Sequence, residues 1–568
     1  MSESVIEFKD FTFKYESQAE PTLFNINLTI KKGEKVLICG PSGCGKSTLS
    51  HCMNGLIPAS YPGEATGSLT IGGVSYKDHS IFSLSKITGT VLQDSDGQFI
   101  GLTVGEDIAF ALENENIKVP EMKERVLNAA QKVGIEGFLS HAPHELSGGQ
   151  KQRVSLAGIM VDDVSLFLFD EPLANLDPQA GKSTIELIEQ IHKTTDSAVV
   201  IIEHRLEDVL YRNVDRVILM SEGRIIADLS PDELLSSNLL IENGIREPLY
   251  VTALKYAGVE ITPSIKPGRI DTLMLSSEDK EKVNKWYKNV TIDQSPLSDE
   301  VLLEAKDISF AYEGGYQALS NISLKVNKGE MLSIVGRNGA GKSTFSKLIC
   351  GFEKPQKGVF YLNGNDLSSY SIKERADHIG YVMQNPNQMI TKPMIRDEVS
   401  LGLVLEGKLS DDEIKAKVDS VLKVCGLYEM RSWPVSALSY GQKKRVTIAS
   451  ILSMDPEIII LDEPTAGQDL RHYTEIMEFL KKLNSLGVTI ILITHDMHLM
   501  LEYTKRAVVF TNGHLIADTS CEEILTDERR CEEASLKKTS LSALALLCNL
   551  PETEFVRRFI QEDKRRRA

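Results

Sequence analysis

Two short glycine-rich segments limit what this chain can fold into more than any other feature. Residues 40–48 read GPSGCGKST, and residues 336–344 read GRNGAGKST. Both match G-x-x-x-x-G-K-[ST], a loop that leads from a strand into a helix. Its backbone N–H groups surround the phosphates of a nucleotide, its Lys reaches the β- and γ-phosphates, and its Ser binds Mg²⁺. The chain is therefore predicted to hold two nucleotide sites in α/β domains.

These loops belong to a longer internal repeat. Lys46 and Lys342 are 296 residues apart, and four further pairs are separated by 291 or 292 residues: Gln93 and Gln384, Ser147 and Ser439, Glu171 and Glu463, His204 and His495. An offset this steady indicates two copies of one domain in the same motif order.

Each copy contains short, continuously apolar segments that end in polar residues. They are VSLFLFDEP and SAVVIIEHR in copy one, and IIILDEP and GVTIILITHD in copy two. Parallel strands covered on both faces have this composition. Their polar residues fall at the carboxyl ends, where α/β sheets bind ligands. We expect a mainly parallel sheet in each copy.

Composition excludes several classes of protein. The 568 residues exceed what one core usually fills, and 63 Lys and Arg against 80 Asp and Glu give a net charge of −17. This balance argues against a nucleic-acid partner. No apolar run approaches the ~20 residues of a membrane helix, and the N-terminus MSESVIEFKDFTF lacks a secretory signal, so we expect a cytosolic chain. The eight Cys show no metal-ligand spacing and predict reduced, mostly buried thiols.

The pattern divides the chain into four parts. Residues 1–240 and 301–530 are predicted to be the two copies, and residues 241–300, which are polar with scattered Pro and Ser, a linker with one short helix. Residues 531–568 are predicted to form a helical tail. Its basic end, KRRR, is interpreted as a solvated terminus, with contact to anionic lipid as the alternative.

Two further motifs identify a family. LSGGQKQR at 146–153 precedes LFLFDEP, and LSYGQKKR at 438–445 precedes IIILDEP. This combination resembles the nucleotide-binding subunits of ABC (ATP-binding cassette) proteins over residues 1–235 and 300–525. The resemblance implies two P-loop NTPase domains, each with a mainly parallel sheet, an antiparallel N-terminal subdomain and a helical subdomain. It also implies that the cassettes pair head to tail within the chain, each ATP lying between one copy's phosphate loop and the other's LSGGQ segment.

The resemblance assigns roles residue by residue. The predicted ATP-phosphate contacts are Gly40, Pro41, Ser42, Gly43, Cys44, Gly45, Lys46, Ser47 and Thr48 in copy one, and Gly336, Arg337, Asn338, Gly339, Ala340, Gly341, Lys342, Ser343 and Thr344 in copy two. The residues predicted to hold or sense Mg²⁺ are Ser47, Gln93 and Asp170, and Ser343, Gln384 and Asp462. The residues predicted to contact the partner copy's γ-phosphate are Ser147, Gly149, Ser439 and Gly441.

The remaining roles concern catalysis and the base. Glu171 and Glu463 resemble the residue that positions the attacking water, and His204 and His495 resemble the residue that contacts the γ-phosphate. Tyr15 and Tyr312 are predicted to stack on adenine. An acidic pair at a strand end can instead cap a helix, and a lone His or Tyr there can be an ordinary core or surface residue.

Three functions fit a two-cassette chain without membrane spans. The segments after Gln93 and Gln384 look like those of energy-coupling factor (ECF) ATPases, which drive vitamin or metal import. LSYGQKKRV looks closest to members associated with uptake of thiamine precursors. The alternatives are a translation factor acting on the ribosome and the ATPase of a sugar importer. The ECF function implies an integral coupling (T) subunit, a substrate-binding (S) subunit and a peripheral position on the cytoplasmic face of the membrane.

Acidic residues are also candidates for the membrane contact. Glu106 and Asp107 follow Gln93, and Asp397 and Glu398 follow Gln384, at the same distance. The family's coupling protein presents Arg-bearing helices to this region, so opposite charges could set the orientation of docking. The alternative is that these acids stabilise helix N-termini.

Overall fold

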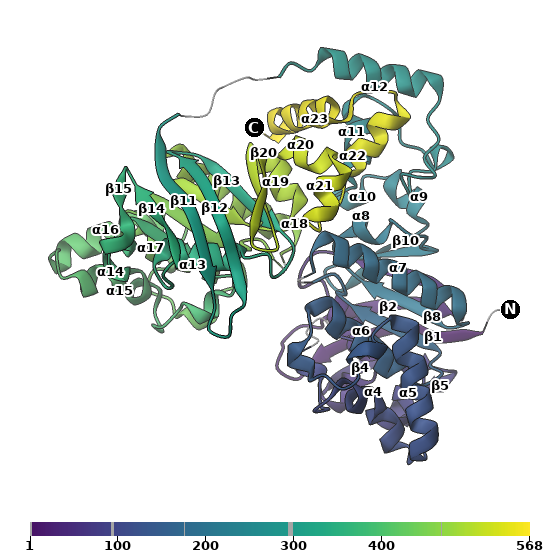
Figure 1. Ribbon diagram of the computed structural model, residues 1–568. Helices are drawn as coiled ribbons and strands as arrows, with labels where there is room; N and C mark the ends of the chain where they lie inside the picture. Colours follow the sequence, from purple (N-terminus) through teal and green to yellow (C-terminus); the bar gives the residue numbers. More distant parts are fainter. Residues whose placement is uncertain (1–2, 93–95, 175, 293–298, 467, 568) are drawn as a thin grey trace. The chain divides into compact units, whose positions relative to one another are not determined.

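The computed structural model describes residues 3–92, 96–174, 176–292, 299–466 and 468–567. The chain divides into two compact units, Met1–Trp286 and Tyr287–Ala568. Figure 1 colours the first from purple to teal and the second from teal through green to yellow. Gln93 lies outside the described residues, so its predicted role stays a prediction.

The first unit contains two sheets. Its strands are β1 (Ser4–Tyr15), β2 (Leu23–Lys31), β3 (Lys35–Cys39), β4 (Gly63–Ile71), β5 (Val74–Ser75), β6 (Thr88–Val91), β7 (Leu166–Asp170), β8 (Ala198–Ile202), β9 (Arg216–Ser221) and β10 (Arg224–Leu229). An antiparallel sheet has the order β2-β1-β4-β5. The other has the order β10-β9-β3-β8-β7-β6, parallel except for β10. Every residue of β3, β7 and β8 is buried, which explains their unbroken apolar composition.

Helices pack around these sheets and form a separate group after β6. The helices of the first unit are α1 (Lys46–Met53), α2 (Leu56–Ala59), α3 (Ile81–Ser85), α4 (Val104–Asn114), α5 (Val119–Val133), α6 (Gly148–Met160), α7 (Pro178–Thr194), α8 (Leu206–Val209), α9 (Pro231–Leu235), α10 (Leu239–Glu242), α11 (Leu249–Tyr256) and α12 (Ser277–Asn289), whose last residues belong to the second unit. Helices α4, α5 and α6 contact one another and form the helical subdomain.

The second unit repeats this plan. Its strands are β11 (Val301–Ala311), β12 (Gln317–Asn327), β13 (Met331–Gly336), β14 (Lys357–Leu362), β15 (Asn365–Asp366), β16 (Ile379–Val382), β17 (Ile458–Asp462), β18 (Thr489–Ile493), β19 (Arg506–Thr511) and β20 (His514–Ser520). The sheets have the orders β12-β11-β14-β15 and β16-β17-β18-β13-β19-β20. The second of these is parallel except for β20. The predicted α/β class with two repeated domains is confirmed.

Its helices also follow the first unit and then continue beyond it. They are α13 (Lys342–Cys350), α14 (Ile372–Ala376), α15 (Ile395–Glu406), α16 (Asp411–Val424), α17 (Tyr440–Leu452), α18 (Leu470–Ser485), α19 (Met497–Tyr503), α20 (Cys521–Thr526), α21 (Glu528–Glu533), α22 (Ser540–Leu547) and α23 (Glu552–Arg567). Residues of α15, α16 and α17 share one apolar cluster, which is the helical subdomain of this unit.

The region interpreted as a linker has more structure than a single short helix. Helix α11 buries Leu249, Val251 and Leu254, and Tyr250 donates a hydrogen bond from its hydroxyl to the carbonyl of Pro267 at 2.5 Å. Helix α12 follows with 13 residues. The prediction of a linker missed this apolar face because polar stretches dominate the composition of residues 241–300.

The basic C-terminus is not simply solvated. Arg567 pairs with Glu502 at 2.8 Å and with Asp563 at 2.9 Å, and both carboxylates are buried. The Tyr287 ring at the end of α12 lies over Phe555 of α23, with ring centroids 6.4 Å apart. The interpretation of KRRR as a solvated end is therefore wrong for Arg567, because one of its partners, Glu502, lies 65 residues away in sequence.

Candidate functional site

The phosphate loops lie where a parallel strand meets a helix. The first connects β3 to α1, and the second connects β13 to α13. Gly45 and Gly341 precede the helices with φ of 100° and 102°, and a Cβ atom at either would lie 2.9 Å and 2.6 Å from a Leu methyl group. Only Gly suits both the left-handed backbone and the close approach, which explains this residue in each motif.

The loop lysines are folded back over the loop backbone. Lys46 Nζ donates to the carbonyls of Gly40 at 2.8 Å and Pro41 at 2.9 Å. Lys342 Nζ donates to Gly336 at 2.7 Å and Arg337 at 3.0 Å. Each ammonium is thus held within the loop, whose N–H groups and following helix N-terminus suit an anion. These residues fit a nucleotide's phosphates.

Two of the predicted Mg²⁺ residues, Ser343 and Asp462, meet in the second unit. Ser343 Oγ donates to Asp462 Oδ2 at 3.2 Å, so the residue that opens α13 and the last residue of β17 meet. Tyr381 also donates to Asp462, at 3.0 Å. A hydroxyl and a carboxylate beside the phosphate loop are oxygen ligands of the kind Mg²⁺ prefers.

In the first unit Asp170 holds the corresponding place at the end of β7. Burial, together with the charge of neighbouring Glu171, raises the pKa of Asp170 to about 6. Burial likewise raises the pKa of Asp462. A bound cation offsets this cost of burying a carboxylate, so both positions suit Mg²⁺.

The two candidate catalytic carboxylates have a strained backbone. Glu171 has φ of 48° and Glu463 has φ of 45°, in the left-handed region. Each N–H nevertheless bonds to the neighbouring strand, Glu171 to Ile202 and Glu463 to Ile493, both at 2.9 Å. Non-glycine residues in this conformation concentrate at functional sites. Helix capping, the alternative for these acids, belongs instead to Asp177 and Asp469, which cap α7 and α18.

The candidate histidines follow the next strands, β8 and β18. Nδ1 of His495 lies 2.7 Å from Oε1 of Glu463. Nδ1 of His204 lies 3.9 Å from Oε1 of Glu171 and 3.3 Å from Oε1 of Glu203. The structure therefore brings each His to its Glu, more closely in the second unit. Motif matching alone did not single out Glu203, a fully buried carboxylate at the position where copy two has Thr494.

The two tyrosines reach the phosphate loops through their hydroxyl groups. Tyr15 Oη donates to Thr48 Oγ1 at 3.1 Å, and Tyr312 Oη and Thr344 Oγ1 are 3.0 Å apart. Both rings are half-buried at the end of a first strand. They are placed beside the loop, as a base-stacking role requires.

The LSGGQ and LSYGQ segments begin α6 and α17. Ser147 and Ser439 cap these helices, because their hydroxyls accept from the N–H of Gln150 and Gln442. Each Gln side chain accepts in return from the Ser N–H, at 2.8 Å and 2.9 Å. This reciprocal capping explains the Ser-x-x-Gln spacing physically. Ser147 and Ser439 are exposed, while Gly149 and Gly441 lie in the first helical turns.

The acidic residues after each loop Gln have structural partners. Asp107 accepts from the N–H of Ile100 at 2.8 Å and Gly101 at 3.1 Å. Glu398, which is buried, accepts from the N–H of Thr391 at 2.8 Å and Lys392 at 2.7 Å. These two acids hold the loop before the helix, so docking by their charges is not supported.

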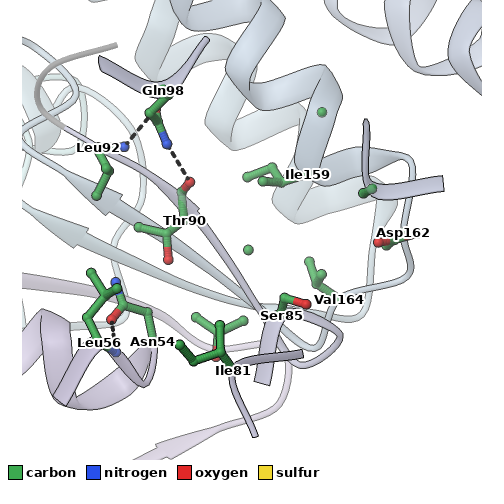
Figure 2. A pocket seen from close by; sticks show the side chains of 14 residues that line it. Asn54, Leu56, Ile81, Ser85, Thr90, Leu92, Gln98, Ile159, Asp162 and Val164 are labelled. Carbon is green, nitrogen blue, oxygen red and sulfur yellow. Dashed lines mark hydrogen bonds between the residues drawn. The ribbon is translucent and has the colours of Figure 1, made fainter. Parts of the chain in front are cut away.

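An apolar surface adjoins the same loop in the first unit. Ile100 and Leu102 are 66% and 82% exposed. A cavity of about 290 Å³ lies nearby, between the loop, β6 and α6 (Figure 2). Gln98 borders it and bonds to Leu92 N at 3.2 Å and Thr90 O at 3.3 Å, while Ile159 and Val164 face it from the other side.

The cysteines and helices agree with two further expectations. All eight Cys are buried and without disulfides, as predicted. Within the described ranges, no helix is both long and apolar enough to cross a membrane.

Comparison with known protein families matches the two repeated units and the segment between them. The family model described as ABC transporter matches residues 23–174 and 319–466. A second model, described as ATP-binding cassette cobalt transporter, matches residues 237–310, the segment between the copies.

Relatives match along nearly the whole chain. An ABC transporter ATP-binding protein of Clostridium perfringens is 59% identical over 562 residues, covering 99% of both chains. One of Enterococcus faecalis is 54% identical over 568 residues, again covering 99% of both. The solved structure of cbiO1 from Clostridium perfringens, described as part of the ABC transporter complex cbiONQ, covers 41% of this chain and 95% of its own, with 34% identity and a TM-score of 0.39. The matched models and full-length relatives show that the chain belongs to the ABC transporter family, as an ATP-binding protein and ATPase with two cassettes.

Proposed function

We propose that the chain is the energy-coupling ATPase of an ECF-type importer. It hydrolyses ATP on the cytoplasmic face of the membrane while bound to an integral coupling (T) subunit, which engages a substrate-binding (S) subunit. The two units pair head to tail and enclose two ATP molecules. The observation that carries this proposal is that both units hold a complete set of described loop Lys, strand-end Asp, Glu and His residues.

Each group has a chemical task in this proposal. Ser47 with Asp170, and Ser343 with Asp462, would hold Mg²⁺, which neutralises charge on the β- and γ-phosphate oxygens when bound. Glu171 and Glu463 orient the attacking water, and His204 and His495 hold the γ-phosphate in place. Lys46 and Lys342 leave their backbone carbonyl partners for the β- and γ-phosphates.

The cargo is a vitamin, a vitamin precursor or a metal ion. The family model that matches residues 237–310 is described as an ATP-binding cassette cobalt transporter, and this description supports a metal ion as the cargo. The fusion of two cassettes in one chain and the LSYGQ sequence support a thiamine precursor as the cargo instead. In either case the cargo contacts the membrane subunits, so identifying those subunits would show which cargo is transported.

The apolar loop of the first unit is the proposed docking site for the T subunit. Ile100 and Leu102 are exposed and follow Gln98, which lines the cavity of Figure 2, by two and four residues in sequence, and exposed apolar side chains that cluster favour a protein partner. Thr391 and Pro393 take the corresponding positions in the second unit. Docking at this loop connects the partner to Gln93, a few residues earlier in sequence.

Purification from gently solubilised membranes tests both parts. The chain should co-purify with two integral membrane proteins, and Ile100→Asp with Leu102→Asp should abolish their recovery while ATP hydrolysis persists. Ile226→Asp, at another exposed apolar position in β10, is the matched control and should keep the complex intact. Ribosomal proteins in the eluate, without membrane subunits, would favour a translation factor.

A further inference from the structure

Three hydrogen bonds in the second unit join the loop that carries Gln384 to the first turns of α17. Tyr440 Oη donates to the carbonyl of Gln384 at 3.0 Å. Lys444 Nζ donates to the same carbonyl at 2.7 Å and to that of Met383 at 3.0 Å. We call these bonds from Tyr440 and Lys444 the Gln384 clasp. It links the end of β16 to the LSYGQ segment across more than 50 residues of sequence.

The clasp has one deeply buried anchor. Lys444 is 1% exposed, so its amine depends on protein acceptors in place of water. Both acceptors are backbone carbonyls just after β16, where the ladder with β17 has ended at Val382. Two donors converge on one carbonyl oxygen, which fixes the position of the Gln384 backbone relative to Ser439 and Gly441 at the helix start.

The first unit has different residues at the matching positions. Gly148 stands in place of Tyr440 and has no side chain, and Gln152 stands in place of Lys444. The Gln152 amide donates to the carbonyl of Pro172 and accepts from Thr184 Oγ1 at 3.2 Å. It is thus directed to the segment after β7. The difference between LSYGQKKR and LSGGQKQR therefore changes which segment the start of the helix is bonded to: the Gln384 loop in the second unit and the segment after β7 in the first.

We propose that Tyr440 and Lys444 are positioning residues that couple the two ATP sites through the second unit. This inference rests on the proposed head-to-tail pairing. There, Gln384 serves the nucleotide on the second phosphate loop, while Ser439 and Gly441 face the nucleotide on the first. Any shift of the Gln384 backbone when the second site fills reaches the first turn of α17 through the clasp. The first site then responds to the occupancy of the second.

A double-mutant cycle measures this coupling. All variants carry Glu463→Gln, so that hydrolysis reports only the first site. Lys342→Ala then empties the second site, and the ratio of first-site turnover with the second site intact to that with it emptied measures the communication. We expect Tyr440→Phe, which removes one hydroxyl, to lower this ratio at least threefold. Lys444→Gln, which supplies the residue of the first unit, should act in the same direction.

The control separates coupling from folding. Tyr428→Phe removes a phenol hydroxyl from the same helical subdomain, where the ring lies under Lys423 and Arg431, and should leave the ratio unchanged. Melting temperatures check that the variants fold, and if Lys444→Gln does not, Tyr440→Phe decides. An unchanged ratio in Tyr440→Phe overturns the clasp even where the proposed ATPase roles hold. Full hydrolysis after Glu171→Gln with Glu463→Gln would instead overturn those roles, and the clasp with them.

Discussion

Nδ1 of His495 lies 2.7 Å from Oε1 of Glu463, in a part of the site where both side chains are largely buried. Thr494 Oγ1 also donates to the other oxygen of Glu463, at 3.4 Å. The second unit therefore fixes its catalytic candidate with two partners. In the first unit His204 lies nearer to Glu203 than to Glu171, and the carboxylate of Glu203 has no proton to donate when ionised.

Replacing Glu203 by Thr should make the first site resemble the second. Without the competing carboxylate, His204 can approach Glu171, and the new hydroxyl can donate to it. We expect first-site turnover, measured with Glu463→Gln present, to rise about two- to tenfold. This corresponds to an activation barrier that is lower by up to about 1.4 kcal/mol.

Glu203→Gln is the control for this change. Glu203 accepts from the N–H groups of Leu173, His204 and Arg205, and an amide oxygen can keep part of this set while removing the charge. Thr494→Glu should lower second-site turnover in the reciprocal experiment. Equal turnover in Glu203→Thr and the parent would show that the His204 position does not limit the first site.

Glu171→Gln together with Glu463→Gln should reduce ATP hydrolysis at least about 100-fold while ATP still binds, because the amide keeps the shape but not the carboxylate that orients water. Lys46→Ala with Lys342→Ala should instead weaken binding. Steady-state hydrolysis and equilibrium binding of labelled ATP distinguish the two outcomes. A double Glu variant with the parent rate would refute the assigned roles.

Much of this arrangement could be predicted from sequence because it follows local rules. The loop glycines, the strand-end Asp and Glu pairs and the positions of His204 and His495 come from strand ends in a parallel sheet, which motif order fixes. The Gln384 clasp could not be predicted, since its donors lie 56 to 61 residues from its acceptors.

The tail shows the same limit. Arg567 and its partner Glu502 are 65 residues apart in sequence, so the run of cations by itself predicted a solvated end. The acids after each loop Gln were ambiguous for another reason. Their spacing fits a docking surface and a helix N-terminus equally, and only the hydrogen bonds of Asp107 and Glu398 decide between them.

Removing the buried carboxylate of Glu398 should destabilise the second unit. Glu398→Ala leaves the N–H groups of Thr391 and Lys392 without their acceptor, and we expect a loss of about 2 kcal/mol in the free energy of unfolding. Asp397→Ala, at the exposed neighbouring position, is the matched control and should cost less than about 1 kcal/mol. Denaturant titration measures both, and equal losses would contradict the structural role.

Lys444 should give stability a distinct pH dependence. Burial lowers its pKa from 10.5 to about 8 in the folded chain, although Asp462 and Glu463 act in the opposite direction. Between these values the unfolded chain binds more protons at this residue than the folded chain does, so its contribution to stability rises with pH. Lys444→Met should remove that rise between pH 8 and about 10.

Lys443→Met, one residue earlier, is the control for this measurement. Lys443 bonds to Asn387 Oδ1 at 3.3 Å in an exposed position. Free energies of unfolding across the pH range should show a smaller slope for Lys444→Met than for this control. Parallel curves would mean that the Lys444 amine is not desolvated in the folded chain.

Gly441 tests whether the start of α17 faces a nucleotide. A Cβ atom there would lie 3.6 Å from His472 Cδ2, an ordinary contact, so Gly441→Ala should fold and change first-site turnover less than about threefold. Gly441→Asp adds a carboxylate beyond the same Cβ atom and places it toward the γ-phosphate. We expect turnover to fall at least about 100-fold, which is about 2.7 kcal/mol of barrier. Because Gly441 is buried, the melting temperatures of both variants check that this loss does not reflect unfolding. Equal turnover of the Ala and Asp variants, with Glu463→Gln in both, would show that this segment does not contact nucleotide.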